Sequence, residues 1–366
     1  MKTVYVLGAG FSIEAGAPSQ ENIVSQIFKL HESNQNIFEH GRFNEFIGFL
    51  KDVLLIPENM HSAIPLEDVF TPLDRCLLDN ISFRELNAED INSTRENIHY
   101  LISRMFDYLL QHDSKKEYIN KFANNLVNKA SVRIDNNYKN KDPVSVISTN
   151  WDILLDNSIK SAIDKNYADK AVVDYCCYVS SHRPDDETVM PGLEMLGRGG
   201  FNVKLLKLHG SLNWLQCPRC QRVYVDFFNK IAMMHFTNKV KCRHCEKNFS
   251  EDTTSHNLVS NLMMPTFLKN LSNPQYKLIW QNAGIELSEA SKIVFIGYSL
   301  PQADFEMRQL LARMVRNNAA IEVVDFGEAE SHNIIQMKKR YQVFFGKRDV
   351  KFHLDGAKSY IDNLVN

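Results

Sequence analysis

The sequence predicts an α/β protein with a Rossmann-like parallel sheet, a large helical insertion and a small four-cysteine zinc module. Three observations lead to this prediction. A short apolar run, Thr3–Leu7, passes directly into a glycine turn. Later apolar runs also end in glycine or polar residues, as parallel strands do where they line a ligand crevice. Two Cys-x-x-Cys pairs then stand close together in the second half of the chain.

The composition restricts the class of protein. At 366 residues, the chain has room for one large domain and a smaller module. Its apolar fraction of 44% and charged fraction of 23% are those of a soluble globular protein. A net charge of -2 argues against nonspecific attraction to nucleic acid, so we expect no direct nucleic-acid binding. We find no secretory signal before the first strand and no apolar run of membrane-spanning length, and therefore expect a cytoplasmic protein.

The first turn predicts a phosphate-binding element. A buried strand that feeds a glycine turn and then a helix can bring backbone amides close to a pyrophosphate. The usual third glycine of a dinucleotide fingerprint is replaced by Ile13, so a tight strand-to-helix turn is the alternative interpretation. The candidate binding residues of this turn are Gly8, Ala9, Gly10, Ser12, Gly16 and Pro18.

A long helical stretch follows, from about Gln20 to Tyr138. Apolar residues recur at helical spacing before Pro57, and again around a capping-box pattern formed by Ser93 and Glu96. The sheet resumes only at Val144, so we expect residues 20–140 to form an insertion over one edge of the sheet. Its apolar faces predict a subunit contact in a homo-oligomer, with burial inside the subunit as the alternative. The candidate residues are Phe43, Phe46, Leu50, Leu101, Met105 and Leu109.

Four further strands are predicted to end at one crevice. The runs and the residues that follow them are 144–149 with Asn150 and Asp152, 205–208 with His209, 293–296 with Gly297 and Ser299, and 321–324 with Asp325. Ligands bind outside the carboxyl ends of parallel strands, so we expect these side chains to meet. A simple turn residue is the alternative interpretation for any one of them.

The two cysteine pairs predict a metal site within residues 215–250. Cys217, Cys220, Cys242 and Cys245 have the spacing of a tetrahedral four-thiolate zinc site. Four protein ligands leave no open coordination position, so we expect the zinc to be structural. Four unpaired buried cysteines are the alternative.

Taken in order, these motifs resemble those of sirtuins across residues 1–366, interrupted by the helical insertion. The shared motifs are Gly8-Ala9-Gly10 with Ser12, Gly16 and Pro18; Asn150 and Asp152; His209-Gly210-Ser211 before the zinc knuckles; and Gly297-Tyr298-Ser299. The resemblance implies NAD+ as the ligand, with Asn150 and Asp152 in the nicotinamide pocket. It also implies that His209 is the general base near the ribose, and that Gly297 and Ser299 contact phosphate and ribose.

Departures from the deacylating sirtuins bear on the reaction. Those enzymes follow Gly-x-Pro with Asp-Phe-Arg, where this chain has Ser19, Gln20 and Glu21. Of their peptide-pairing stretch, only Pro265 is present. The aromatic Trp151 between Asn150 and Asp152, together with the insertion, resembles the sirtuin-like effectors of bacterial anti-phage defence, which hydrolyse NAD+. A motor-type ATPase partner is common in that group, and is implied here only by family analogy.

The expected reaction is cleavage of NAD+ to nicotinamide and ADP-ribose. Asp152 can accept from the carboxamide, Asn150 can orient a water, and His209 can take its proton. Asp325 is expected at the adenosine ribose, with a turn cap as the alternative. Two other functions stay open: an NAD-dependent protein deacylase, and a noncatalytic sensor of NAD+ or ADP-ribose.

Overall fold

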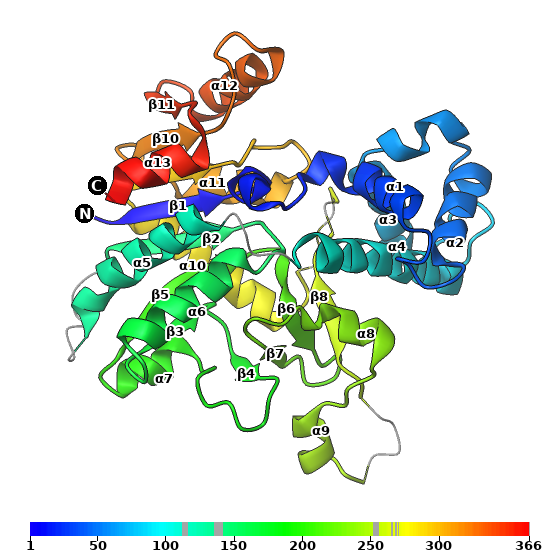
Figure 1. The fold of residues 1–366 in the computed structure, drawn as a ribbon, viewed down its shortest axis with the longest axis horizontal. Helices are drawn as coiled ribbons and strands as arrows, with labels where there is room; N and C mark the ends of the chain where they lie inside the picture. The colour runs from blue at the N-terminus through cyan, green and yellow to red at the C-terminus, as the bar shows by residue number, and fades with distance from the viewer. Residues whose placement is uncertain are drawn as a thin grey trace.

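Seven parallel strands form the central sheet of this computed structural model, which describes residues 1–111, 116–134, 142–251, 256–264, 266, 267, 269 and 271–365 (Figure 1). In spatial order they are β11 (Val350–His353), β10 (Ala320–Val324), β9 (Lys292–Ile296), β1 (Thr3–Leu7), β2 (Val144–Ser148), β5 (Phe201–Lys207) and β3 (Ala171–Asp174). The predicted Rossmann-like parallel sheet is therefore confirmed.

The sheet has its switch point beside β1. After β1 the chain forms β2, then β3 at the far edge and β5 between them, and it returns to form β9, β10 and β11 on the other side of β1. Residues Val4–Leu7 of β1 are at most 1% exposed because strands flank β1 on both sides and helices cover the sheet. At such a point the loops after the strands diverge, which opens a crevice at their carboxyl ends.

Most predicted strand ends lie within two residues of the observed strand ends. The exception is β5, which begins at Phe201 rather than at Leu205. Strands β3 and β11 were not predicted from the sequence. Both have only 4 residues, and β11 alternates apolar residues with Lys351 and His353 on a partly exposed edge. Such short runs carry little periodic signal.

Helices cover both faces of the sheet (Figure 1). On one face α5 packs between α6 and α13, and on the other α10 packs against α11. The helices that belong with this sheet are α5 (Glu117–Ala130), α6 (Leu154–Asn166), α7 (Gly192–Gly197), α10 (Pro274–Glu289), α11 (Phe305–Met314), α12 (His332–Phe345) and α13 (Gly356–Val365).

Four helices form a separate group beside the sheet, on the right in Figure 1. They are α1 (Ile23–Ser33), α2 (Arg42–Gly48), α3 (Leu66–Asp79) and α4 (Ala88–Leu109). The predicted helical stretch is thus divided, because α5 shares the core of the sheet while α1–α4 share a second core. The second core includes Trp151, Leu212 and Met264, so this group lies against the site loops and the zinc module rather than over a sheet edge. The predicted end of the stretch, at residues 135–141, lies outside the described residues.

Two details of the helical prediction are wrong. Helix α4 begins at Ala88, where the Asn87 side chain accepts from the backbone N–H of Glu89 at 2.8 Å and of Asp90 at 3.1 Å. This earlier capping box replaces the one predicted at Ser93 and Glu96. The proposed contact residues Phe43, Phe46, Leu50, Leu101 and Met105 are buried inside the subunit, as in the alternative interpretation.

A second sheet carries the cysteine module below the central sheet in Figure 1. Its strands, in spatial order, are β4 (Val179–Ser181), β7 (Val223–Val225), β6 (Gly210–Gln216) and β8 (Val259–Leu262). Short helices α8 (Met234–Thr237) and α9 (Arg243–Asn248) complete it. Among the helices that the structure describes, none combines the length and the hydropathy needed to cross a membrane.

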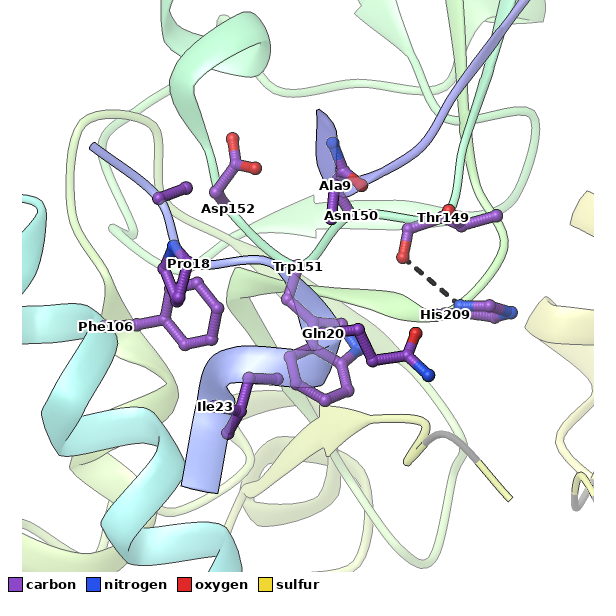
Figure 2. Close-up of a pocket in the computed structure, with 11 residues that line it drawn as sticks. Ala9, Pro18, Gln20, Ile23, Phe106, Thr149, Asn150, Trp151, Asp152 and His209 are labelled. Atoms are coloured by element: carbon purple, nitrogen blue, oxygen red, sulfur yellow. Dashed lines mark hydrogen bonds between the residues drawn. The ribbon is translucent and has the colours of Figure 1, made fainter. Parts of the chain in front are cut away.

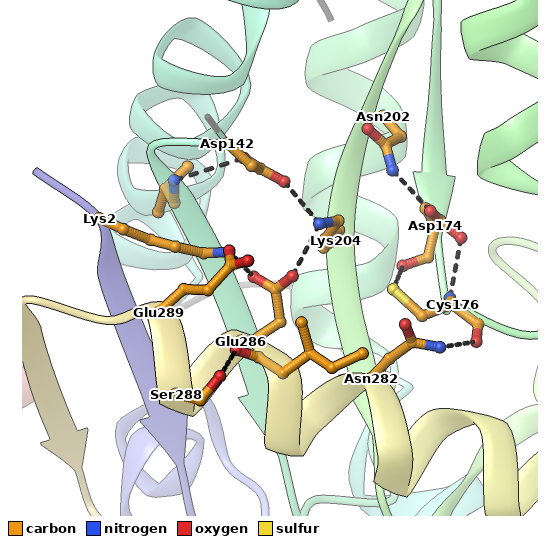
Figure 3. Close-up of polar contacts among 12 residues, drawn as sticks. Lys2, Asp142, Asp174, Cys176, Asn202, Lys204, Asn282, Glu286, Ser288 and Glu289 are labelled. Carbon is orange, nitrogen blue, oxygen red and sulfur yellow. Dashed lines mark hydrogen bonds and ion pairs between the residues drawn. The ribbon is translucent and has the colours of Figure 1, made fainter. Parts of the chain in front are cut away.

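A buried ion network ties the strands together at the end opposite the crevice (Figure 3). The Glu286 carboxylate of α10 accepts from Lys2 at 2.7 Å and from Lys204 of β5 at 2.7 Å. Lys204 also pairs with Asp142, just before β2, at 3.1 Å. The network therefore links the starts of β1 and β2 to β5 and α10.

Candidate functional site

The carboxyl ends of the strands open into one cleft with a side pocket. The cleft has a volume of about 640 Å³, and its lining includes the predicted residues Gly8, Ala9, Gly10, His209, Gly297, Ser299 and Asp325. The pocket, of about 60 Å³, is lined by the predicted residues Ala9, Pro18, Asn150, Asp152 and His209 (Figure 2). Cleft and pocket share Ala9, Gln20, Thr149 and His209, so the pocket lies directly beside the cleft.

The helical group contributes a wall of the pocket. Figure 2 shows Phe106, from α4, and Ile23, at the start of α1, across from the residues that follow β2. The Phe106 ring meets Trp151 edge-on at 6.1 Å, and the Trp151 Nε1–H donates to the Met263 carbonyl at 3.1 Å. The pocket therefore has fixed aromatic sides that suit a flat ring.

The first turn differs from the predicted helix start. Two single 3-10 turns, Ala9–Phe11 and Ile13–Ala15, follow β1 instead of an α-helix. A Cβ at Gly8 would lie 2.5 Å from the Gly297 carbonyl oxygen, and one at Gly10 would lie 2.6 Å from the Gly297 Cα. These glycines thus let the β1 turn pack directly on the β9 turn, which places both backbones at the cleft.

Two predicted residues of the first turn, Ser12 and Gly16, do not line the cleft or the pocket. Ser12 is buried and lies 3.4 Å from the Asn150 Nδ2, while its hydroxyl also contacts the Asp152 carboxyl. Gly16 has a left-handed φ of 96° and ends the second 3-10 turn. Both residues shape the turn rather than line the cleft or the pocket described above.

Asn150 is oriented by the first turn. Its Nδ2 donates to the Gly8 carbonyl at 2.9 Å, which fixes the amide plane. With the described residues, Oδ1 makes no hydrogen bond, and the side chain lines the pocket. The amide oxygen is therefore available to accept from water or a ribose hydroxyl.

Asp152 is held at the start of α6. Its Oδ1 accepts from the Leu154 N–H at 3.1 Å, and Lys207 donates to its backbone carbonyl at 2.5 Å. Burial raises the pKa of the Asp152 carboxyl, and the nearby Lys207 ammonium offsets this only in part. Lys207 is itself buried and pairs with Asp156 at 3.2 Å. Lys207 was not predicted as a site residue, because an inward position on a strand favours an apolar residue.

His209 presents one ring nitrogen to the cleft. Its Nδ1 lies 3.2 Å from the Thr149 carbonyl, drawn as the dashed line in Figure 2. A carbonyl only accepts, so this contact assigns the hydrogen to Nδ1 and leaves Nε2 as the acceptor. Nε2 is buried and makes no hydrogen bond with a described residue. That is the arrangement a general base requires.

Three charged residues of the site were not anticipated. Asp304 lies between β9 and α11, with Oδ1 3.5 Å from His209 Nε2 and 2.8 Å from Lys269 Nζ. Arg340 of α12 lines the cleft, and its Nε–H donates to the Ser299 carbonyl at 3.0 Å. None of the three directly follows a strand, so the strand-end pattern could not find them.

Asp325 is positioned as predicted, at the end of β10. Its Oδ1 accepts from the Phe326 N–H at 2.8 Å, which is the contact of a turn cap. Burial raises the pKa of its carboxyl. Because Asp325 also lines the cleft, both interpretations made from the sequence are compatible with its place.

The four cysteines meet in the module. The Sγ atoms of Cys217, Cys220, Cys242 and Cys245 all lie within 4.8 Å of one another. Two of the separations, Cys217 to Cys245 and Cys220 to Cys242, are 3.7 Å. Zn–S bonds of about 2.3 Å in a tetrahedron place the sulfurs about 3.8 Å apart, so the thiols fit zinc and are too far apart for disulfides.

Comparison with protein families gives one match in this region. Residues 226–263 match the family model described as the BED zinc finger. The match contains Cys242 and Cys245, and the structure adds Cys217 and Cys220 from before it. The module is a structural zinc site. Cys217 directly follows β6, and β6 begins directly after His209, so zinc at this site would hold the end of the strand that starts there.

The most similar solved structures include several Sir2 homologues. One is a mutant Sir2 homologue in complex with 2'-O-acetyl ADP ribose, with a TM-score of 0.42 and 13% identity over 100% of this chain and 90% of that chain. A Sir2 homologue–NAD complex has a TM-score of 0.42 and 13% identity, covering 100% and 88%. Sir2Tm bound to a propionylated peptide has a TM-score of 0.39 and 13% identity, covering 99% and 91%. No curated protein matches the sequence.

Proposed function

We propose that the protein is an NAD+ glycohydrolase, which cleaves NAD+ to nicotinamide and ADP-ribose. The observation that carries this proposal is the single space shared by His209, Asn150 and Asp152 beside the glycine turns of β1 and β9. The base, the water-orienting amide and the ring pocket of such a reaction would all lie within this space.

Each part of the substrate has a corresponding place. The nicotinamide ring would enter the aromatic pocket beside Asp152, and the rest of the dinucleotide would extend along the larger cleft. Arg340 would face the diphosphate, because it brings a cation to the cleft next to Ser299. Asp325 would lie near the adenosine ribose, at the end of β10.

The reaction follows from these positions. Departure of nicotinamide breaks the glycosidic C–N bond, and the electron pair goes to the ring nitrogen. Water then adds to the oxocarbenium carbon while its proton passes to His209 Nε2. Asn150 Oδ1 would hold the water in line, and this preorganisation lowers the barrier.

A role as an abortive-infection effector in anti-phage defence is part of the proposal, and so are a homo-oligomer and an ATPase partner. These rest on the resemblance of the motifs alone. The deacylase alternative depends on a peptide-pairing strand around Pro265, Leu268 and Asn270, which lie outside the described residues.

Product analysis tests the proposal. The purified protein is incubated with NAD+, with and without an acetyl-lysine peptide, and the products are separated by chromatography. We expect equal amounts of ADP-ribose and nicotinamide in both cases, and a loss of about 10²–10⁴-fold in rate for His209→Ala. Asn150→Ala should be similarly slow.

Three results would contradict this assignment. O-acetyl-ADP-ribose formed only with the peptide would establish a deacylase. Tight binding of ADP-ribose with intact NAD+, both in vitro and in cells that express the chain, would establish a sensor. Wild-type turnover by His209→Ala would show that the site works without this base.

A further inference from the structure

His209 has an acidic neighbour on the side of its free nitrogen. The Asp304 Oδ1 lies 3.5 Å from Nε2, a distance at which no hydrogen bond forms while Nε2 carries a lone pair. Both side chains line the large cleft. An acceptor therefore faces an acceptor, and a proton on Nε2 would turn this contact into an ion pair.

Asp304 is fixed by other groups before any substrate arrives. Its side chain is 6% exposed, its Oδ1 accepts from Lys269 Nζ at 2.8 Å, and its Oδ2 accepts from the Tyr298 hydroxyl at 2.7 Å. The Tyr298 hydroxyl comes from the loop after β9, between the predicted Gly297 and Ser299. The carboxylate thus cannot turn away from His209 without losing these bonds.

The charges around His209 are unequal. Lys269 pairs with Asp304 and also with Glu306, at 3.2 Å. One ammonium among two carboxylates leaves one negative charge in a largely buried place, next to an imidazole. A positive charge on the imidazole would balance it, since charge interactions are stronger where water is excluded.

We propose that Asp304 is a positioning residue that stabilises His209 in its protonated form as Nε2 takes the proton of the attacking water. This inference rests on the proposed function and extends it. In this step the water O–H bond breaks, an N–H bond forms at Nε2, and the water oxygen keeps the electron pair with which it bonds to the sugar carbon.

Asp304 does not take the proton itself. Burial alone would raise the pKa of its carboxyl, but His209 in its protonated form and the Lys269 ammonium outweigh burial and hold that pKa well below its ordinary value. The carboxylate stays ionised through the cycle, so the new N–H at Nε2 is paired as soon as it forms. Release of that proton to solvent resets the site.

The test uses Asp304→Asn, which keeps the shape and the contact with Tyr298 but removes the charge. NAD+ hydrolysis is measured as kcat and KM between pH 5 and 9, beside the binding of ADP-ribose and the melting temperature. We expect kcat to fall about 10–100-fold, with ADP-ribose affinity changed less than about threefold.

Glu306→Gln is the matched comparison. It removes the same charge from the same lysine, but Glu306 has no described contact with His209. We expect a clearly smaller effect on kcat, again with little change in ADP-ribose affinity.

The outcomes separate the two hypotheses. An active wild type with the same kcat in Asp304→Asn would overturn the role of Asp304 alone. A lower melting temperature with equal losses in kcat and ADP-ribose binding would assign Asp304 a structural role and likewise overturn the inference. A wild type that leaves NAD+ intact would overturn the proposed function and, with it, the role of Asp304.

Discussion

The site residues that could be predicted are those attached to a strand end. Asn150, His209 and Ser299 each follow an apolar run, and parallel strands bring their carboxyl ends to one edge. Asp304 and Arg340 reach the same cleft from a loop and from α12. Their positions depend on how helices return to the sheet, which no local pattern encodes. The placement of these residues at the cleft was therefore predictable, but the placement of the charged residues around them was not.

Arg340 leads to the first prediction at the scale of single residues. Among the described residues, no carboxylate forms an ion pair with it, and it faces the cleft between Ser299 and Asp325. We expect Arg340→Gln to weaken ADP-ribose binding about 10–100-fold, as loss of one charge-assisted hydrogen bond would. Binding of adenosine, which lacks the diphosphate, should change less than about threefold. Titration calorimetry at two salt concentrations measures both.

Lys339→Gln provides the control, since it removes the same charge from an exposed position on the same helix. It should leave both affinities unchanged. Equal losses for ADP-ribose and adenosine in Arg340→Gln would instead show that Arg340 only supports the loop of Ser299.

At the scale of elements, the β1 and β9 turns form one unit. The Gly10 N–H donates to the Gly297 carbonyl at 2.9 Å, and a Cβ on Gly297 would lie 2.2 Å from the Phe11 nitrogen. The glycine pattern was interpreted from the sequence as a phosphate cradle. The structure adds a second reason for it, which is contact between two backbones that are far apart in sequence.

Gly297→Ala should therefore be costly. Its φ of +60° is unfavourable for alanine, and the added methyl would force the two turns apart. We expect a loss of about 3 kcal/mol or more in the free energy of unfolding, measured with urea. Gly16→Ala, with a φ of +96° but nothing within 4 Å, should cost only about 1–2 kcal/mol. Equal costs would mean that the contact between the turns is not tight.

The zinc module is the second element with a measurable role. The backbone N–H of Met263, just after β8, donates to the His209 carbonyl at 2.9 Å. The module therefore fixes the backbone of His209. Its cysteine spacing was sufficient to predict the metal, whereas the four-stranded sheet around it was not predicted, because β4 and β7 have 3 residues each.

Cys220→Ser should release the metal. We expect one zinc per chain in the wild type by elemental analysis, and much less in the variant. The melting temperature should fall by about 5 °C or more, because metal binding contributes to folding. We expect the loss to appear mainly in stability, and only weakly in the kcat of the molecules that remain folded. Full zinc content in Cys220→Ser would show that three cysteines are sufficient.

At the scale of the whole molecule, two cores meet at the site. Asn150, Asp152 and His209 follow strands of the sheet, whereas Phe106 and Ile23 belong to the core of α1–α4. A movement of the helical group would therefore open or close the pocket. The periodicity of apolar residues was sufficient to predict that helices form in this stretch. It could not predict the division into two cores, because an apolar helix face does not show which element it packs against.

The ion network below the sheet gives the last prediction. Glu286 is 3% exposed and joins Lys2 and Lys204, so Glu286→Gln would leave both lysines with fewer partners. We expect a loss of about 3–5 kcal/mol in the free energy of unfolding at pH 7. Glu289→Gln should cost less than about 1 kcal/mol, because its side chain is 49% exposed although it contacts the same Lys2 at 2.9 Å.

The pH dependence of that loss follows from the pKa of Glu286. Burial would raise it, but Lys204 and Lys2 outweigh burial, and the pKa in the folded protein lies below the ordinary value of 4.5. The contribution of Glu286 is therefore complete above pH 4.5 and is lost as the pH falls through the lower, folded value. Urea unfolding of wild type and Glu286→Gln should differ by a constant amount from pH 5 to 7, and converge below pH 4.5. A difference that does not shrink in acid would show that the lysines do not hold this carboxylate in its charged form.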